Sequence, residues 1–118
     1  MQNSIVENEI DTLFKALADT TRRKVLELLS SGDASVKELA AHFTHALPSF
    51  MQHLRILEAC GLITTKKKGR IRTCSLDVEK LDVVEEWISQ QHALWESRLD
   101  QLDLFLQSRQ KEENHERK

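Results

Sequence analysis

The chain of 118 residues is long enough for one domain with a small core, and its 40% hydrophobic and 31% charged residues are typical of a globular protein. One proline and three glycines leave few helix breakers, which predicts a mostly helical fold. The sequence has no run of about 18 apolar residues, which excludes a membrane-spanning helix, and its first ten residues contain no Lys or Arg, unlike a signal peptide. Two cysteines without an export signal favour a reducing compartment, so we expect a cytoplasmic protein with no membrane partner.

The net charge of −2 conceals an uneven distribution. Between Ala34 and Leu76, seven Lys and Arg side chains stand against two Glu, a surplus of five positive charges, and the rest of the chain therefore carries −7. Five of the seven cations fall within residues 66–72. Charge separated in this way indicates that the middle of the chain meets a polyanion.

Apolar residues at helical spacing predict four helices in the first half of the chain. The predicted helices cover roughly residues 5–18, 20–29, 35–43 and 47–60. Asp19 is a suitable N-cap for the second helix, and Ser35 with Glu38 has the spacing of a capping box at the start of the third. Gly61 and Leu62 fit a Schellman stop after the fourth.

The pattern then changes to two short β-type runs around Lys68 and Gly69, which predicts a hairpin over residues 62–76. Helical spacing returns from about Val78 to Arg109, where one apolar stripe extends over about 45 Å. That length exceeds what so small a domain can cover, so we expect the stripe to meet a second copy of the chain. The polar residues 110–118 are expected to form a disordered tail.

This order of elements predicts a mostly α fold with a small β-hairpin, that is, a winged helix-turn-helix with a long C-terminal dimerisation helix. We expect a single domain over residues 1–109. The helix-turn-helix occupies 35–60 within it, and the hairpin at 62–76 is the wing. A basic hairpin directly after a helix pair favours double-stranded DNA as the partner.

The phase of the fourth helix separates a core face from a DNA face. Phe50, Leu54 and Leu57 lie on one side, which must face the core. On the opposite side lie Gln52 and Arg55, and Ser49 and Met51 flank them near the start of the helix; all four are expected to reach base edges or phosphates. An amide such as Gln52 pairs with adenine edges, and an apolar side chain such as Met51 suits a thymine methyl group.

The cations of the hairpin are expected to contact the phosphate backbone, because a polyanion relieves their mutual repulsion. The expected contacts are Lys67, Lys68, Arg70 and Arg72. Side chains alternate along a strand, so not all of these point the same way, and we favour Lys68 and Arg70 at the tip.

The sequence contains no nucleophile with a base and an orienting group, and no Gly-rich phosphate loop. We therefore predict no catalytic residue, no cofactor and no enzyme activity. On the last helix His92 shares a face with carboxylates, but a single imidazole indicates a solvated face rather than a zinc site. Cys60 and Cys74 are expected to be packing residues.

Four segments resemble the ArsR/SmtB family of bacterial winged-helix repressors: Leu17–Leu26, Pro48–Glu58, Gly61–Ile63 and Lys68–Arg70. The resemblance implies a homodimer joined by the helices at 5–18 and 78–109, and repression by binding an operator. The implied interface residues are Ile10, Leu13, Phe14, Trp95, Leu99, Leu102 and Leu106. A two-fold dimer predicts a palindromic site.

The departures from the family pattern concern a cap and the metal sites. Ala46 stands where Ser or Thr often caps the recognition helix. Metal-sensing members carry a Cys-x-Cys pair in the third helix, and residues 36–41 contain no thiol, so the chain resembles the branch without the usual metal sites. Two alternatives stay open: a metal- or redox-responsive sensor of the same fold, and a protein-interaction module that has lost DNA binding. An inducer of unidentified structure is also left open.

Overall fold

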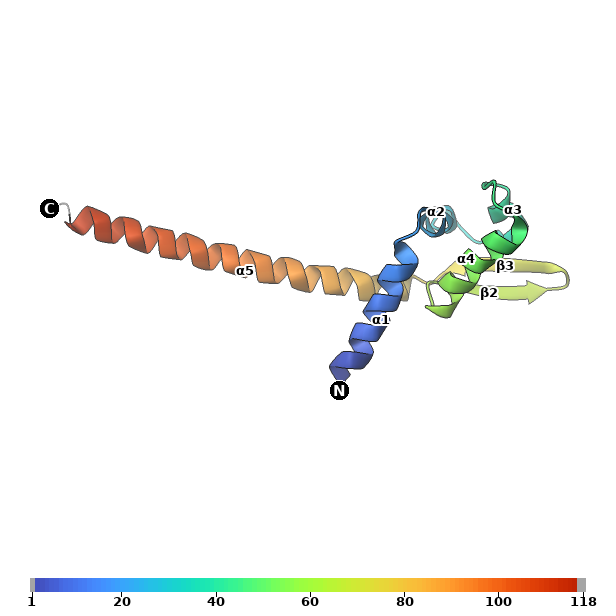
Figure 1. Cartoon of the computed structure of the whole chain (residues 1–118), viewed down its shortest axis with the longest axis horizontal. Helices are drawn as coiled ribbons and strands as arrows, with labels where there is room; N and C mark the ends of the chain where they lie inside the picture. Colours follow the sequence, from blue (N-terminus) through green and yellow to red (C-terminus); the bar gives the residue numbers. More distant parts are fainter. Residues whose placement is uncertain (1, 117–118) are drawn as a thin grey trace. The chain divides into compact units, whose positions relative to one another are not determined.

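The computed structural model describes residues 2–116, with side-chain burial for residues 9–114. Five helices and a small sheet follow one another along this part of the chain (Figure 1). The helices are α1 (Gln2–Leu17), α2 (Thr20–Leu29), α3 (Val36–Ala40), α4 (Leu47–Ala59) and α5 (Val78–Glu116). The strands are β1 (Ala34–Ser35), β2 (Ile63–Lys68) and β3 (Ile71–Leu76). This is the mostly helical architecture that the sequence predicts.

The chain divides into two compact units, Met1–Val84 and Glu85–Lys118, and the boundary falls inside α5. We describe each unit by itself. The first holds every strand described here and the start of α5, and the second consists of the rest of that helix. The predicted grouping of residues 1–109 into one domain stays a prediction.

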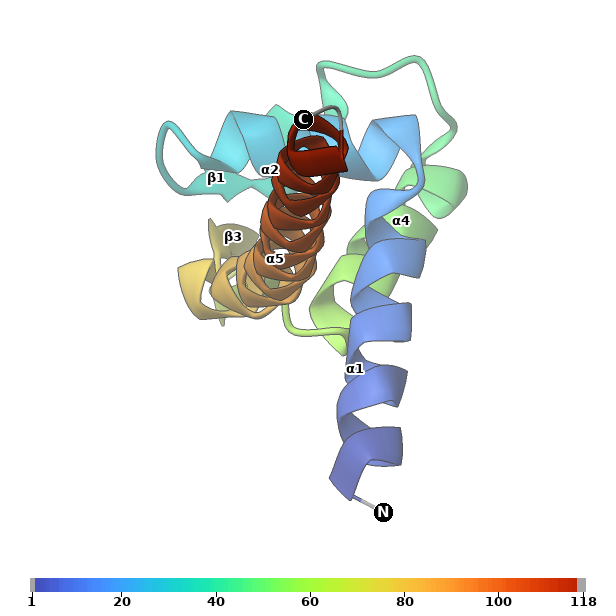
Figure 2. The same cartoon turned by 90° about the vertical axis from the view of Figure 1, so that its left-hand side faces the viewer.

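The predicted caps of α2 and α3 are both present. The Asp19 carboxylate accepts a hydrogen bond from the backbone N–H of Arg22 at 3.1 Å. Ser35 and Glu38 form a reciprocal capping box, in which the Glu38 N–H donates to the Ser35 hydroxyl at 3.1 Å. These side chains satisfy amides that a helix N-terminus leaves unpaired, and α2 and α3 therefore begin where the sequence predicts. Figure 2 shows α2 running at a steep angle across the C-terminal end of α1.

The stop after α4 is also as predicted. The Leu62 N–H donates to the Leu57 carbonyl and the Gly61 N–H to the Glu58 carbonyl, both at 3.0 Å, which is the Schellman pattern. Gly61 has a φ of +82°. A Cβ at this position would lie 2.9 Å from Cε of Lys80, so both conformation and space favour glycine here.

The third helix is shorter than predicted. Instead of continuing to Phe43, α3 ends at Ala40. The Ala41 amide still donates four residues back, to the Lys37 carbonyl, whereas the amides of His42 and Phe43 donate to carbonyls three residues back. After this turn the centroid of the Phe43 ring lies 5.2 Å from that of Phe50 in α4, so the two rings pack together across the turn.

The sheet has one strand more than the predicted hairpin. Its order is β1–β3–β2 and all pairs are antiparallel. In the hairpin Ile63 lies opposite Leu76, and Lys68 lies opposite Ile71. The extra strand, β1, pairs Ala34 with Cys74. Two residues are too few to show a β pattern in a sequence, so only the tertiary pairing reveals this strand.

The core of the first unit is formed by α1, α2, α3, α4, the sheet and the start of α5. Its largest fully buried side chains are Leu13, Val25, Leu39, Phe50, Leu57, Leu62, Ile63 and Cys74. Two of the predicted interface residues, Ile10 and Leu13, are buried by the chain itself to 7% and 0% exposure, which leaves them little surface for a partner, and their place in a dimer interface stays a prediction. Phe14, the third predicted residue of α1, is half-buried. An apolar stripe in the sequence of a helix predicts that the stripe is covered, but not whether its own chain or a partner covers it.

Where the sequence predicts a disordered tail from residue 110, the described residues differ, because α5 continues to Glu116. Residues 110–116 are rich in Gln, Lys and Glu, which are good helix formers, and contain no glycine or proline. Lys118, at the end of the predicted tail, lies outside the described residues. Between residues 2 and 116 no helix has the length and apolar content that a membrane span needs.

In the second unit, the large apolar side chains are exposed. Trp95, Leu99, Leu102 and Leu106, all predicted interface residues, are 62%, 57%, 53% and 52% exposed. The stripe predicted on the last helix therefore has no cover within its own unit.

Candidate nucleic-acid interface

The helix α4 separates its side chains into a buried and an exposed face. Phe50, Leu54 and Leu57 are at most 2% exposed, as predicted from their phase. Four residues of α4 are predicted to contact DNA. Ser49, Gln52 and Arg55 are exposed, and Met51 is half-buried. The helix thus has an outward face on which a partner can lie.

The start of α4 has no side-chain cap. Its N-cap is Ala46, which makes no capping hydrogen bond, and Pro48 occupies the first turn. The departure noted in the sequence is therefore confirmed. The amides that remain at this end, together with the positive end of the helix dipole, favour an anion at the start of α4.

A polar cluster holds the inner side of α4 against the ends of two other helices. The Arg22 guanidinium donates to the carbonyls of Lys15 and Ala16 in α1, at 3.0 and 2.7 Å. It also lies 3.2 Å from Nδ1 of His53 in α4. A guanidinium only donates, so His53 accepts at Nδ1 in this contact. One side chain thereby connects the end of α1 to the middle of α4.

Asp19 completes this cluster. Its carboxylate lies 3.6 Å from Nδ1 of His53. The hydrogen bond from the Arg22 backbone, with the charge of the Arg22 guanidinium, holds the pKa of Asp19 below its usual value. Sequence periodicity does not indicate the partners of His53, because Asp19 and Arg22 come from a segment about 30 residues earlier.

The hairpin concentrates positive charge without acidic partners. Lys67 and Arg72 lie opposite each other in the register, and like charges in such a pair destabilise a sheet. Among residues 9–114 no acidic side chain forms an ion pair with Lys67, Lys68, Arg70 or Arg72, all of which are exposed. A bound polyanion would relieve this repulsion.

A hydrogen bond fixes the wing to α4. The Thr65 hydroxyl donates to the Glu58 carboxylate at 2.9 Å. Because side chains alternate along a strand, Lys67 lies on the same face of β2 as Thr65 and the buried Ile63, the face that packs against α4. Lys68 lies on the other face. The sequence analysis favoured Lys68 over Lys67 as a phosphate contact, and in the fold these two lysines lie on opposite faces of β2.

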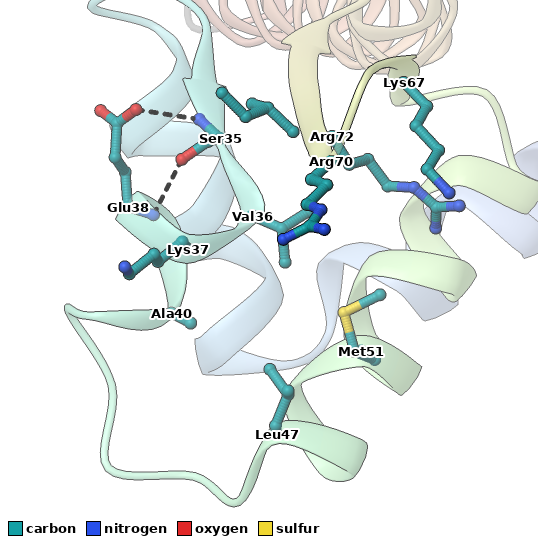
Figure 3. A pocket seen from close by; sticks show the side chains of 11 residues that line it. Ser35, Val36, Lys37, Glu38, Ala40, Leu47, Met51, Lys67, Arg70 and Arg72 are labelled. Carbon is teal, nitrogen blue, oxygen red and sulfur yellow. Dashed lines mark hydrogen bonds between the residues drawn. The ribbon is translucent and has the colours of Figure 1, made fainter.

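A groove lies between α3, the start of α4 and the wing (Figure 3). Four of the predicted DNA-binding residues line it: Met51, Lys67, Arg70 and Arg72. The other four, Ser49, Gln52, Arg55 and Lys68, are exposed outside it. The structure thus brings half of the predicted site together in one groove.

Three further residues of the groove escaped the sequence analysis. Lys37 comes from α3, Leu47 from the first turn of α4 and Ile71 from β3. Leu47 and Ile71 are each 60% exposed, which is unusual for large aliphatic side chains.

The described side chains show no metal site. No three His, Cys, Asp or Glu residues among them gather closely enough to hold an ion. His92 lies 3.4 Å from Glu96, one helical turn away on α5. Cys60 and Cys74 are free and buried, and burial raises the pKa of the Cys74 thiol, which lowers its reactivity.

A short helix, a turn and a second helix, followed by a hairpin beside the second helix, define a winged helix-turn-helix protein. A solved structure titled as the homodimeric winged helix-turn-helix DNA-binding domain of a Mycobacterium bovis protein has the same fold, with a TM-score of 0.63. The two chains are 22% identical, and the match spans 78% of this chain and 88% of that structure. The predicted fold class is therefore confirmed.

The family follows from three comparisons. Residues 19–65 match the model of the bacterial regulatory proteins of the ArsR family. The transcriptional repressor SdpR of Bacillus subtilis is 37% identical over 67% of this chain and 88% of its own length. A crystal structure of an ArsR family transcriptional regulator is 50% identical, with a TM-score of 0.75 over 77% of this chain and 94% of that one. The chain belongs to the ArsR family, whose members regulate transcription by binding DNA, and it is not an enzyme.

Proposed function

We propose that this protein is a transcriptional repressor that acts as a homodimer on a palindromic operator in the cytoplasm. The observation that carries the proposal is the position of the wing cations, which lie beside the exposed face of α4 and form no ion pair with an acidic side chain among residues 9–114. SdpR, 37% identical over most of its length, is a repressor by name, which favours repression over activation.

In the proposed complex the exposed face of α4 enters the major groove. Gln52 and Arg55 then meet base edges, with Ser49 near the start of the helix. The wing cations meet phosphates of the flanking backbone. These two groups of contacts have different consequences, because base contacts discriminate between sequences and phosphate contacts do not.

The proposed dimer uses the exposed stripe of α5. Trp95, Leu99, Leu102 and Leu106 lie within about 60° of one another around the helix, so a second copy can cover all four. Large apolar side chains more than half exposed, in series along one helix, are typical of an interface. A two-fold dimer would bind half-sites whose centres are about one helical turn of DNA apart, or a multiple of that.

The test begins with selection of bound fragments from random DNA, which gives a cognate duplex and a scrambled control. Gln52→Ala should cost about 1–3 kcal/mol on the cognate duplex and little on the scrambled one. Lys68→Ala should weaken both alike and lower the salt slope of log K by about one, because one counterion fewer is released. Titrations at several salt concentrations measure both effects.

Lys111→Ala is the matched control, since it removes an exposed cation from the far part of α5. It should leave affinity and salt slope unchanged. The proposal is wrong if no fragment is enriched, or if Gln52→Ala weakens both duplexes equally while Lys68→Ala changes neither.

A further inference from the structure

The groove beside α4 has an apolar floor inside a positively charged rim. Leu47 and Met51 are four residues apart, so they lie one turn above each other on the same side of α4. Figure 3 shows both side chains directed into the space between α4 and the wing. Across that space stand Lys67, Arg70 and Arg72.

The exposed position of Leu47 is not explained by the core of the protein. Phe50, Leu54 and Leu57 supply the packing of α4 and are at most 2% exposed, whereas Leu47 is 60% exposed. The wing adds Ile71, also 60% exposed, to the same groove. A large aliphatic surface left in water is unfavourable by about 25 cal/mol per Å², so this strip is suited to an apolar group of a partner.

The charges around the apolar strip of Leu47, Met51 and Ile71 indicate what kind of partner fits the groove. The groove is lined by the cations Lys37, Lys67, Arg70 and Arg72, and its one acidic residue, Glu38, already accepts a hydrogen bond from the Ser35 N–H at 3.4 Å. An apolar strip inside a cationic rim fits a polyanion that carries methyl groups. In the major groove of DNA, thymine presents such a methyl group beside the phosphate backbone.

We propose that Leu47 and Met51 recognise thymine methyl groups, which makes the first turns of α4 selective for thymine at the base steps they face. The proposal rests on the proposed function, because it requires this face to bind DNA. It adds a source of specificity that needs no hydrogen bond, next to the polar recognition assigned to Gln52. Leu47 is the new specificity-determining residue, and the cations of the rim position the backbone.

Deoxyuridine is the probe, since it keeps the pairing edge of thymine and lacks only the methyl group. Each thymine of the selected duplex is replaced singly, and the affinity ratio of the thymine and deoxyuridine duplexes is measured. At one or two positions in each half-site the ratio should be about four, the equivalent of one buried methyl group at about 0.8 kcal/mol. At the remaining positions the ratio should be near one.

Leu47→Ser and Met51→Ser assign the effect to side chains. Each variant should bring the ratio at its own position close to one, since the methyl group then meets no apolar partner. Lys68→Ala is the matched control, because it should weaken both duplexes equally and leave every ratio unchanged. Both serine variants replace side chains that are not fully buried, and circular dichroism and thermal melting establish that they are folded.

Three outcomes would overturn the proposal while leaving the proposed function intact. The protein could bind the selected duplex tightly with every ratio near one, so that no methyl group is recognised. The ratios could differ from one but be unaffected by both serine variants, so that another side chain recognises the methyl group. Leu47→Ser could also leave both affinity and ratios unchanged, in which case the groove holds something other than DNA. Failure to select any duplex would instead overturn the proposed function itself.

Discussion

The two units of this protein treat the same residue types in opposite ways. Leu54 and Leu57 in the first unit are 2% and 0% exposed, whereas Leu99 and Leu106 in the second are 57% and 52% exposed. Both pairs lie on regular helices at helical spacing, so local structure does not distinguish them. The comparison teaches that burial depends on whether other elements cover a helix. Among the described residues of the second unit, no other element covers the apolar face of α5.

A pair of alanine substitutions tests this comparison most strongly. Leu57→Ala should destabilise the protein by about 2–5 kcal/mol, because it leaves a cavity in a packed core. Leu104→Ala, at a side chain that is 65% exposed, should change stability by less than about 0.5 kcal/mol. Chemical denaturation followed by circular dichroism measures both. Similar losses for the two variants would remove the distinction between the units.

Charges on the stripe of α5 test the proposed partner. Burying a Leu contributes about 1.5–3 kcal/mol, so Leu99→Asp combined with Leu102→Asp should raise the dimer dissociation constant by about 100-fold or more. Sedimentation at about tens of micromolar should then show monomers for the variant and dimers for the parent. Leu104→Asp is the control, since Leu104 lies on the side of the helix away from the stripe and should leave the dimer intact. A parent that sediments as a monomer would contradict the dimer.

Asp19 makes the stability of the first unit depend on pH. Its pKa is lowered in the folded chain, so the stability it contributes is present above its unfolded pKa of about 3.9 and is lost as pH falls through the folded value. Asp19→Ala should cost about 1 kcal/mol near neutral pH through the lost cap, and its stability should converge with that of the parent as pH falls through the lowered pKa of the folded chain.

Asp19→Asn separates the cap from the charge, because Asn caps a helix without titrating. It should retain most of the neutral-pH stability and lose part of the acid sensitivity. Denaturation midpoints between about pH 2 and 7 measure both variants. An offset between Asp19→Ala and the parent that stays constant down to the lowest pH would contradict the role assigned to the Asp19 charge.

The smallest effect is expected at the thiols, which the core of the first unit protects. Burial raises the pKa of Cys74, so little reactive thiolate forms. Cys60→Ala with Cys74→Ala should leave DNA affinity close to that of the parent, and peroxide should change neither. A parent that releases DNA on oxidation, with a double variant that does not, would establish a redox sensor in place of this prediction.

Much of the first unit was predictable because its signals are local. The Asp19 cap, the capping box of Ser35 with Glu38 and the stop at Gly61 depend on residues at most five positions apart. The phase of α4 likewise follows from helix geometry alone, and it correctly separated Phe50 from Gln52.

The tertiary structure decided what depends on distant residues. The sequence by itself determined the order of the elements, the faces of α4 and the concentration of positive charge in the wing, since periodicity, capping and composition act over short distances. Only the fold showed that Leu13 belongs to the core and that Arg22 joins α1 to His53. It alone placed Leu47 beside the wing cations. These contacts join segments far apart in the chain, and packing selects them among many that the sequence pattern allows.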